Sequence, residues 1–229
     1  AEYGNANAGV FDIRLRNGNN EKHEFTGQFG FLGTELAAEG PISKEKGSSY
    51  LATYRYSTLK LFDALNMKIG TSAVPAYQDA SFKLNFPTKK HGNISLFAIG
   101  GDSKIDIVLS TQPVAEIELY GENDRDQYFG TSMGVVGVTH TRSLNEKTYI
   151  KTTIAAYGSD VHSRHELFTR DTTTHVVDSI FPKLGYDFKS GKYSVNFSFT
   201  KKIDTKHSIK AGILADVMTF NYVDSNFIE

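Results

Sequence analysis

Apolar and polar residues alternate along much of this chain. The alternation is uninterrupted in residues 79–86 (DASFKLNF) and 193–200 (YSVNFSFT). Because successive side chains of a β-strand point to opposite faces of its sheet, each of these segments would have one apolar and one polar face. The pattern therefore predicts strands that lie between an apolar and a polar environment.

The same reading along the chain predicts nine strands. Two of them, over residues 93–101 and 208–222, are apolar on both faces and fit the alternation less well. The predicted strands are Phe25–Leu32, Thr34–Ile42, Ser49–Thr58, Tyr77–Phe86, Asn93–Gly101, Asp126–Arg142, Thr148–Ser159, Lys192–Lys202 and Ser208–Tyr222.

The connections between these strands are of two kinds. Four are compact polar turns, within Ser43–Ser48, Pro87–Gly92, Ser143–Thr148 and Lys202–His207. Three are long, over Leu59–Ala76, Asp102–Arg125 and Val161–Gly191. In an antiparallel meander the short turns would lie at one end and the long loops at the other, apart from a short first connection at Leu32–Thr34. This asymmetry is typical of outer-membrane barrels, although a soluble β-sandwich would show the same strand period.

Composition agrees with an all-β fold and excludes several functions. Twelve Tyr, sixteen Phe and twenty Gly favour strands and turns, and the net charge of −1 has no basic excess that would indicate nucleic-acid binding. The absence of cysteine excludes disulfides and thiolate metal sites. No apolar run reaches the roughly 20 residues of a membrane helix, whereas a membrane strand needs only about 9–11 residues.

The chain begins with AEYGNANAGVFDIRLRNG, in which glycines and asparagines lead into an alternating run. Asp12, Arg14 and Arg16 would share one face of a strand there, and Phe11, Ile13 and Leu15 the other. We expect a strand that carries charges toward a wet or polar surface.

This opening resembles the end of the plug domain of TonB-dependent outer-membrane receptors. YGNANAGVFDIRLRNG is similar to the plug's last strand, although Ala8-Gly9 stands where many members have two glycines. EGPISKEKGSSYLATYRYS and YQDASFKLNFPTKKHGNISLFAIGG resemble the barrel strands that follow, closest to the subgroup that carries a carboxypeptidase-regulatory-like domain before the plug. The likeness is strong over about the first hundred residues and is one of pattern alone beyond them.

The resemblance implies an all-β fold: a partial, antiparallel transmembrane β-barrel of about nine of roughly 22 strands, preceded by the last plug strand. Residues 1–20 would end the plug, residues 21–229 would form the N-terminal part of the barrel, and the chain would be a piece of a longer protein. The implied function is energy-dependent uptake of a nutrient ligand at the cell outer membrane. Implied partners are membrane lipid, the nutrient, the TonB complex through a segment absent from this chain, and, as a further candidate, a surface lipoprotein. A non-catalytic β-sandwich module for surface binding or adhesion is the alternative.

Charged residues on the expected inner face are the candidate site residues. They would either contact the plug or simply make the lumen polar, and Arg14 and Arg16 of the plug strand could pair with Glu35 or Glu39. The candidates for plug contacts are Arg14, Arg16, Glu35, Glu39 and Arg55, and those for lumen-facing positions are Asp79 and Lys83.

No motif predicts catalysis, a cofactor or a metal. HSRHE at residues 162–166 lacks the spacing of zinc hydrolases and is expected in a solvated loop. GENDRDQ at residues 121–127 lacks the ligand spacing of a calcium loop, so its acids are expected to be solvated or paired with Arg125. The sequence therefore indicates a protein that is not an enzyme.

Overall fold

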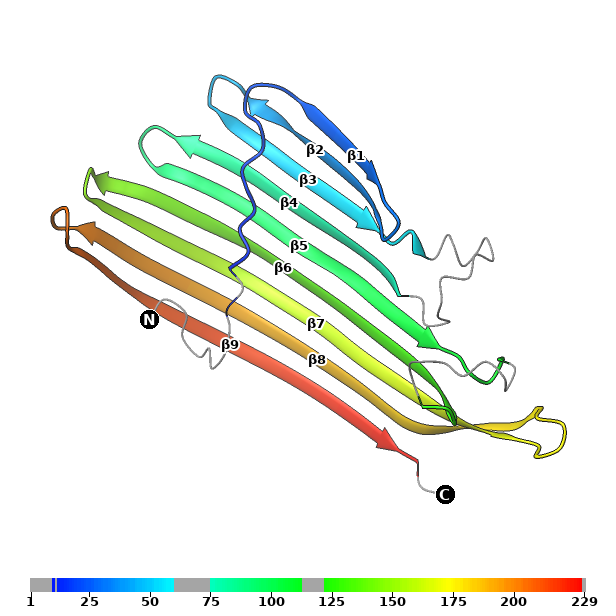
Figure 1. Cartoon of the computed structure of the whole chain (residues 1–229). Coiled ribbons are helices and arrows are strands. Elements are labelled where there is room, and N and C mark those ends of the chain that lie inside the picture. The colour runs from blue at the N-terminus through cyan, green and yellow to red at the C-terminus, as the bar shows by residue number, and fades with distance from the viewer. Residues whose placement is uncertain (1–9, 11, 60–74, 113–121, 228–229) are drawn as a thin grey trace.

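The computed structural model describes residue 10 and residues 12–59, 75–112 and 122–227, and in them the chain forms one antiparallel sheet (Figure 1). Nine strands pair in chain order, each with its sequence neighbours, which confirms the all-β prediction. No helix in these ranges is long and apolar enough to cross a membrane. The strands are β1 (Glu24–Phe29), β2 (Thr34–Ser43), β3 (Ser48–Tyr56), β4 (Ala76–Thr88), β5 (Gly92–Ile107), β6 (Arg125–Asn145), β7 (Thr148–Arg170), β8 (Val177–Lys202) and β9 (Ser208–Asn226).

The later strands are much longer than the sequence pattern predicts. β7 and β8 have 23 and 26 residues, so the expected long loop over Val161–Gly191 is wrong. Most of that segment continues the hairpin, and only residues 171–176 connect the two strands. Residues 102–107, expected in a loop, likewise belong to β5. The mixed polarity of these extensions conceals them, because their outward side chains are polar and the apolar alternation stops.

The connections still differ between the two ends of the sheet. The tight turns at residues 44–47, 89–91, 146–147 and 203–207 gather at the upper left of Figure 1. Gly47 and Gly92 have φ values of 66° and 82°, a left-handed backbone that favours glycine. In the last turn the Asp204 carboxylate accepts hydrogen bonds from the backbone N–H groups of Lys206 and His207, at 2.7 and 2.8 Å. Most of the expected loop over Leu59–Ala76 and part of that over Asp102–Arg125 lie outside the described residues.

The N-terminal segment is not a strand, contrary to the prediction. Residues 12–19 pair with no strand of the sheet and instead run extended across one of its faces, as the dark blue trace in Figure 1 shows. The sequence of this segment does alternate between apolar and polar residues, but a strand also needs a hydrogen-bonded neighbour. The edge strand β1 pairs with β2 alone, so it supplies no partner for the segment.

Few apolar side chains are buried. Among the described residues Leu51, Leu59, Ile107, Leu109, Phe168 and Pro41 are buried, and Ile107, Leu109 and Phe168 pack together at the long-connection end. Most apolar side chains therefore lie on the two faces of the sheet and not in a core between layers.

Buried polar groups fix the chain beside that small cluster. The Asp126 carboxylate, 2% exposed, accepts hydrogen bonds from the backbone N–H groups of Leu109 and Ser110, both at 2.8 Å, and from Ser110 Oγ at 2.6 Å. Arg170 Nη2 donates to the carbonyl oxygens of Leu109, Ser110 and Gln112. The residues after β5 are thereby held against the start of β6 and the end of β7.

We expect Asp126→Ala to release residues 108–112, because two buried N–H groups would lose their acceptor at about 1–3 kcal/mol each. Hydrogen exchange of the Leu109 and Ser110 amides in the intact protein measures this release. Asp178→Ala, an exposed acid at the same end, is the matched control. Equal exchange in the two variants would contradict the role of Asp126.

Candidate functional site

The sheet has two chemically different faces. We call the face crossed by residues 12–17 the inner face, and the opposite one the outer face. Lys83 Nζ donates a hydrogen bond to the carbonyl oxygen of Leu15 at 2.6 Å, which places the Lys83 side chain on the inner face. A cavity of about 1470 Å³ lies between this segment and strands β3 to β9.

Polar side chains form a continuous row on the inner face. Register places Ser49 opposite Asn85, and continues the row through Ser95, Thr139 and Thr153 to Asn196. Ser95 Oγ donates to Asn85 Oδ1 at 2.9 Å, and the hydroxyls of Thr139 and Thr153 lie 3.1 Å apart. The inner face can therefore contact water or a polar polypeptide segment. It is not wholly polar, because Phe97, Ile99, Val135 and Leu214 also line the cavity.

The outer face carries an apolar band, which we call the outer band. One row of directly paired residues crosses all nine strands without a polar side chain, and its members are Phe25, Ala38, Ala52, Phe82, Ala98, Val136, Ala156, Tyr193 and Val217. Neighbouring rows toward the short turns are also mainly apolar, with His140 and Thr152 as interruptions. Exposed fractions are high, at 66% for Tyr193, 65% for Val217 and 72% for Ile213. No second layer covers this band within the described residues.

A row of glycines marks one edge of the outer band. Gly100, Gly134, Gly158 and Gly191 are direct partners across β5 to β8. Beyond this glycine row, toward the long-connection end, the outward side chains become polar. Examples are Asp160, His162, Arg164, Asp187 and Lys189, which take part in ion pairs there. The outer band is thus bounded on one side by charged side chains.

The structure pairs one of the two candidate arginines with a candidate glutamate. Arg16 Nη1 and Nη2 donate to the two carboxylate oxygens of Glu39 at 2.6 and 2.5 Å. The Asn19 backbone N–H also donates to Glu39, at 2.7 Å. Glu39, on β2, therefore holds the extended segment at two points.

The other candidates lie on the inner face with different partners. Arg14 pairs with Asp12 on its own segment at 2.5 Å. Arg55 faces Glu35 in register but donates to Asp79, at 2.7 to 2.8 Å, and lies over the Tyr77 ring. Lys83, a candidate for a lumen-facing position, contacts the segment directly.

Sequence reasoning missed further contacts of the segment. A Cβ atom added to Gly18 would lie 1.9 Å from the Tyr50 carbonyl oxygen, so only glycine permits this close approach of two backbones. Asn19 Nδ2 also donates to Glu24 at 2.7 Å. No sequence pattern predicts these partners of Gly18 and Asn19, because the partners come together only in the fold.

Two motifs that were set aside in the sequence lie at or within strands of the sheet. The histidines of HSRHE belong to β7, where an odd spacing puts His162 and His165 on opposite faces, so the expected solvated loop is wrong. His165 packs edge-on to Phe129, and burial, together with the nearby Arg125, lowers the pKa of its imidazole.

In GENDRDQ, Glu122 and Asp124 pair with Arg125 as expected, and the Arg125 guanidinium lowers the pKa of the Asp124 carboxyl. Asp126 differs, because it is buried against Ser110. Among the described residues no group of three or more His, Asp or Glu side chains could hold a metal ion.

Charge is distributed unequally between the two ends of the sheet. The four short turns, taken with the four strand residues on each side of each turn, contain eleven Lys and Arg and three acidic residues. The described connections at the opposite end, taken with the same flanks, contain four basic and eight acidic residues. We call the first group the basic rim: Lys44, Lys46, Lys89, Lys90, Arg142, Lys147, Lys151, Lys201, Lys202, Lys206 and Lys210.

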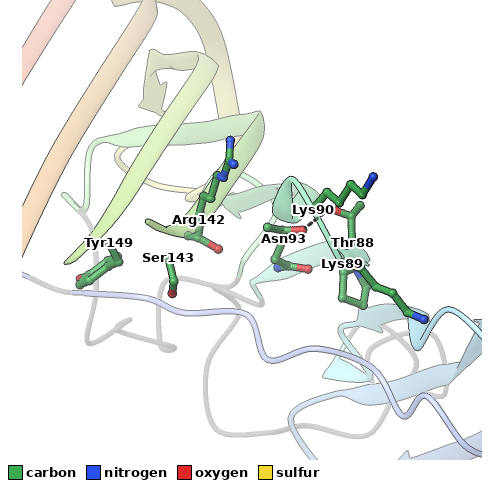
Figure 2. A pocket seen from close by; sticks show the side chains of 10 residues that line it. Thr88, Lys89, Lys90, Asn93, Arg142, Ser143 and Tyr149 are labelled. Carbon is green, nitrogen blue, oxygen red and sulfur yellow. Dashed lines mark hydrogen bonds between the residues drawn. The ribbon is translucent and has the colours of Figure 1, made fainter. Parts of the chain in front are cut away.

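A pocket of about 550 Å³ lies within the basic rim, between the β4–β5 and β6–β7 turns. Figure 2 shows Arg142 and Lys90 extending toward one side, while Ser143 and Tyr149 point to the other. Tyr149 also lines the inner cavity. These cations therefore do not converge on one enclosed point.

No protein-family model, curated protein or solved structure matches the chain. Function is therefore inferred from the two faces of the sheet and from the segment that crosses one of them.

We expect Arg16 and Glu39 to be energetically coupled. A double-mutant cycle of Arg16→Gln and Glu39→Gln in the intact protein should give about 1 kcal/mol, which is below the usual value for a charged hydrogen bond because Arg16 is largely exposed. Exchange of the Asn19 amide reports release of the segment. Glu35→Gln is the control, and a coupling energy near zero would contradict the role of Glu39.

Proposed function

We propose that this chain is part of a TonB-dependent outer-membrane receptor for energy-dependent uptake of a nutrient. Its nine strands would belong to a transmembrane barrel, with the outer band toward lipid and the inner face toward the lumen. Residues 12–19 would be the end of the plug. The chain would act by binding and transport and not by catalysis.

The observation that carries the proposal is the arrangement of the two faces. The apolar face is uncovered in the described residues, while the polar face holds the only segment that crosses the described sheet. A soluble protein buries its apolar face against another layer and exposes its polar face. Membrane barrels reverse this order, because lipid is their outer solvent.

The dimensions of the outer band agree with this proposal. In β9 the outward positions from Ile209 to Val217 are apolar, a span of nine residues, and a tilted membrane strand needs about 9–11. β6 to β9 are longer than that, and their extensions beyond the glycine row are polar on the outer face. Such strands would cross the hydrocarbon and continue into water.

The contacts of residues 12–19 support a plug that is tied to the barrel wall. Arg16 and the Asn19 backbone bind Glu39, and Gly18 lies against Tyr50. A polypeptide inside the lumen needs polar partners on the wall, and this arrangement supplies them. Ligand uptake would then require upstream plug residues to move while this end stays attached.

A soluble β-sandwich for adhesion would need a second apolar layer over the outer band. Such a layer would make the band inaccessible both to lipid and to water. Access of the outer band to lipid therefore separates this alternative from the barrel.

We expect Phe197→Arg to destabilise the complete protein in a bilayer by about 2–4 kcal/mol, because Phe197 lies near the middle of the outer band. Asn196→Arg, one residue away on the inner face, is the matched control and should cost much less. The measurement is the unfolding free energy in lipid vesicles. Equal losses for the two variants would contradict a lipid-facing outer band.

We also expect the two ends of the sheet to lie on opposite sides of the membrane. An epitope tag in residues 171–176 should be accessible to antibody on intact cells, and one in residues 203–207 only after the outer membrane is opened. The reverse accessibility would contradict the proposed orientation, and access to both tags on intact cells would contradict the membrane-spanning sheet.

A further inference from the structure

Six cations of the basic rim are available to an external partner. They are exposed, and in the described part of the chain Lys89, Lys90, Arg142, Lys147, Lys201 and Lys202 have no acid within 4.0 Å. At the opposite end Arg125, Arg164 and Lys189 form ion pairs with neighbouring acids. In the described residues, the short-turn end therefore has a surplus of positive charge, whereas acids outnumber cations at the opposite end.

Some of these cations lie directly beside the outer band. Lys201 shares the outer face with Phe199, two residues away, and Arg142 faces Ile150 in register. Gly92 packs against the Arg142 stem, since an added Cβ would lie 2.9 Å from Arg142 Cβ. In Figure 2 the Arg142 and Lys90 side chains extend to the same side, away from Tyr149. Their charges thus border the apolar surface.

This position fits the phosphates of membrane lipids. Long basic side chains next to an apolar surface place their stems on it and their charges in the headgroup layer. Each Lys or Arg near an anionic membrane surface contributes about 1 kcal/mol, roughly a five-fold gain in binding. The net charge of the whole chain is only −1, so the attraction would come from the rim and not from the protein as a whole.

We propose that the basic rim binds anionic phospholipid headgroups in the leaflet on the short-turn side. This inference rests on the proposed function, because it requires the outer band to lie in a bilayer. The acidic surplus at the other end disfavours the same lipids there. The lipid contacts of the protein are thus asymmetric across the membrane.

Spin-labelled lipids test the proposal with the complete protein in phosphatidylcholine vesicles. Electron paramagnetic resonance resolves a motionally restricted component from lipids at the protein surface. We expect labelled phosphatidylglycerol to be preferred over labelled phosphatidylcholine by about two-fold, averaged over both leaflets, and high salt to reduce the preference. Excess inorganic phosphate at constant ionic strength should not displace the lipid, and displacement would indicate a simple anion site and overturn the proposal.

A triple variant locates the effect. Lys90→Gln, Arg142→Gln and Lys201→Gln together should abolish most of the preference, whereas Lys104→Gln, Lys183→Gln and Lys189→Gln at the opposite end should leave it nearly unchanged. Restricted lipid without any preference would overturn the inference and leave the proposed function standing, and the rim would then serve another anionic partner such as an acidic protein. Absence of restricted lipid of either kind would overturn both.

Discussion

The structure depends on one constraint: the two faces of a single sheet require different solvents. Residues that pair directly across neighbouring strands form rows on the two faces. Phe82, Ala98 and Val136 form part of an outer row, and Asn85, Ser95 and Thr139 form part of an inner row. Water suits the second row and not the first. A sheet without a second layer can satisfy both only where its apolar face meets lipid or another apolar surface. The proposed barrel meets this requirement without further elements on the outer face.

The inner face holds a polypeptide segment that forms no β-ladder hydrogen bonds with the sheet. Residues 12–19 have extended backbone but no ladder, so their position depends on individual contacts to Glu39, Lys83 and Tyr50. Contacts of this kind fix one end of a segment to the sheet. That arrangement suits a plug, which must stay attached to its barrel and still change conformation.

Sequence reasoning could predict the strands and not their environment on each side. Alternation in residues 79–86 and 193–200 and the turn residues around Gly47 and Gly92 were sufficient for nine strands in meander order. The extensions of β7 and β8 were missed because polar outward residues there, such as Asp160 and Lys189, remove the apolar signal. Gly100, Gly134, Gly158 and Gly191 form a row only through register, which single-sequence patterns do not reveal. Charge complementarity suggested the partner of the candidate residue Arg16, whereas the partners of Asp126, which was not a candidate, required the fold.

The most direct test of the account is a spin-label accessibility scan of β8 in the complete protein reconstituted in lipid. The chain has no cysteine of its own, so single cysteines at positions 193 to 198 can each carry a nitroxide. The account predicts that labels at 193, 195 and 197 collide preferentially with oxygen dissolved in the bilayer. Labels at 194, 196 and 198 should collide less with oxygen. Labels at the outward positions that are shielded from both oxygen and a polar nickel chelate would place the band in a protein core and contradict the account.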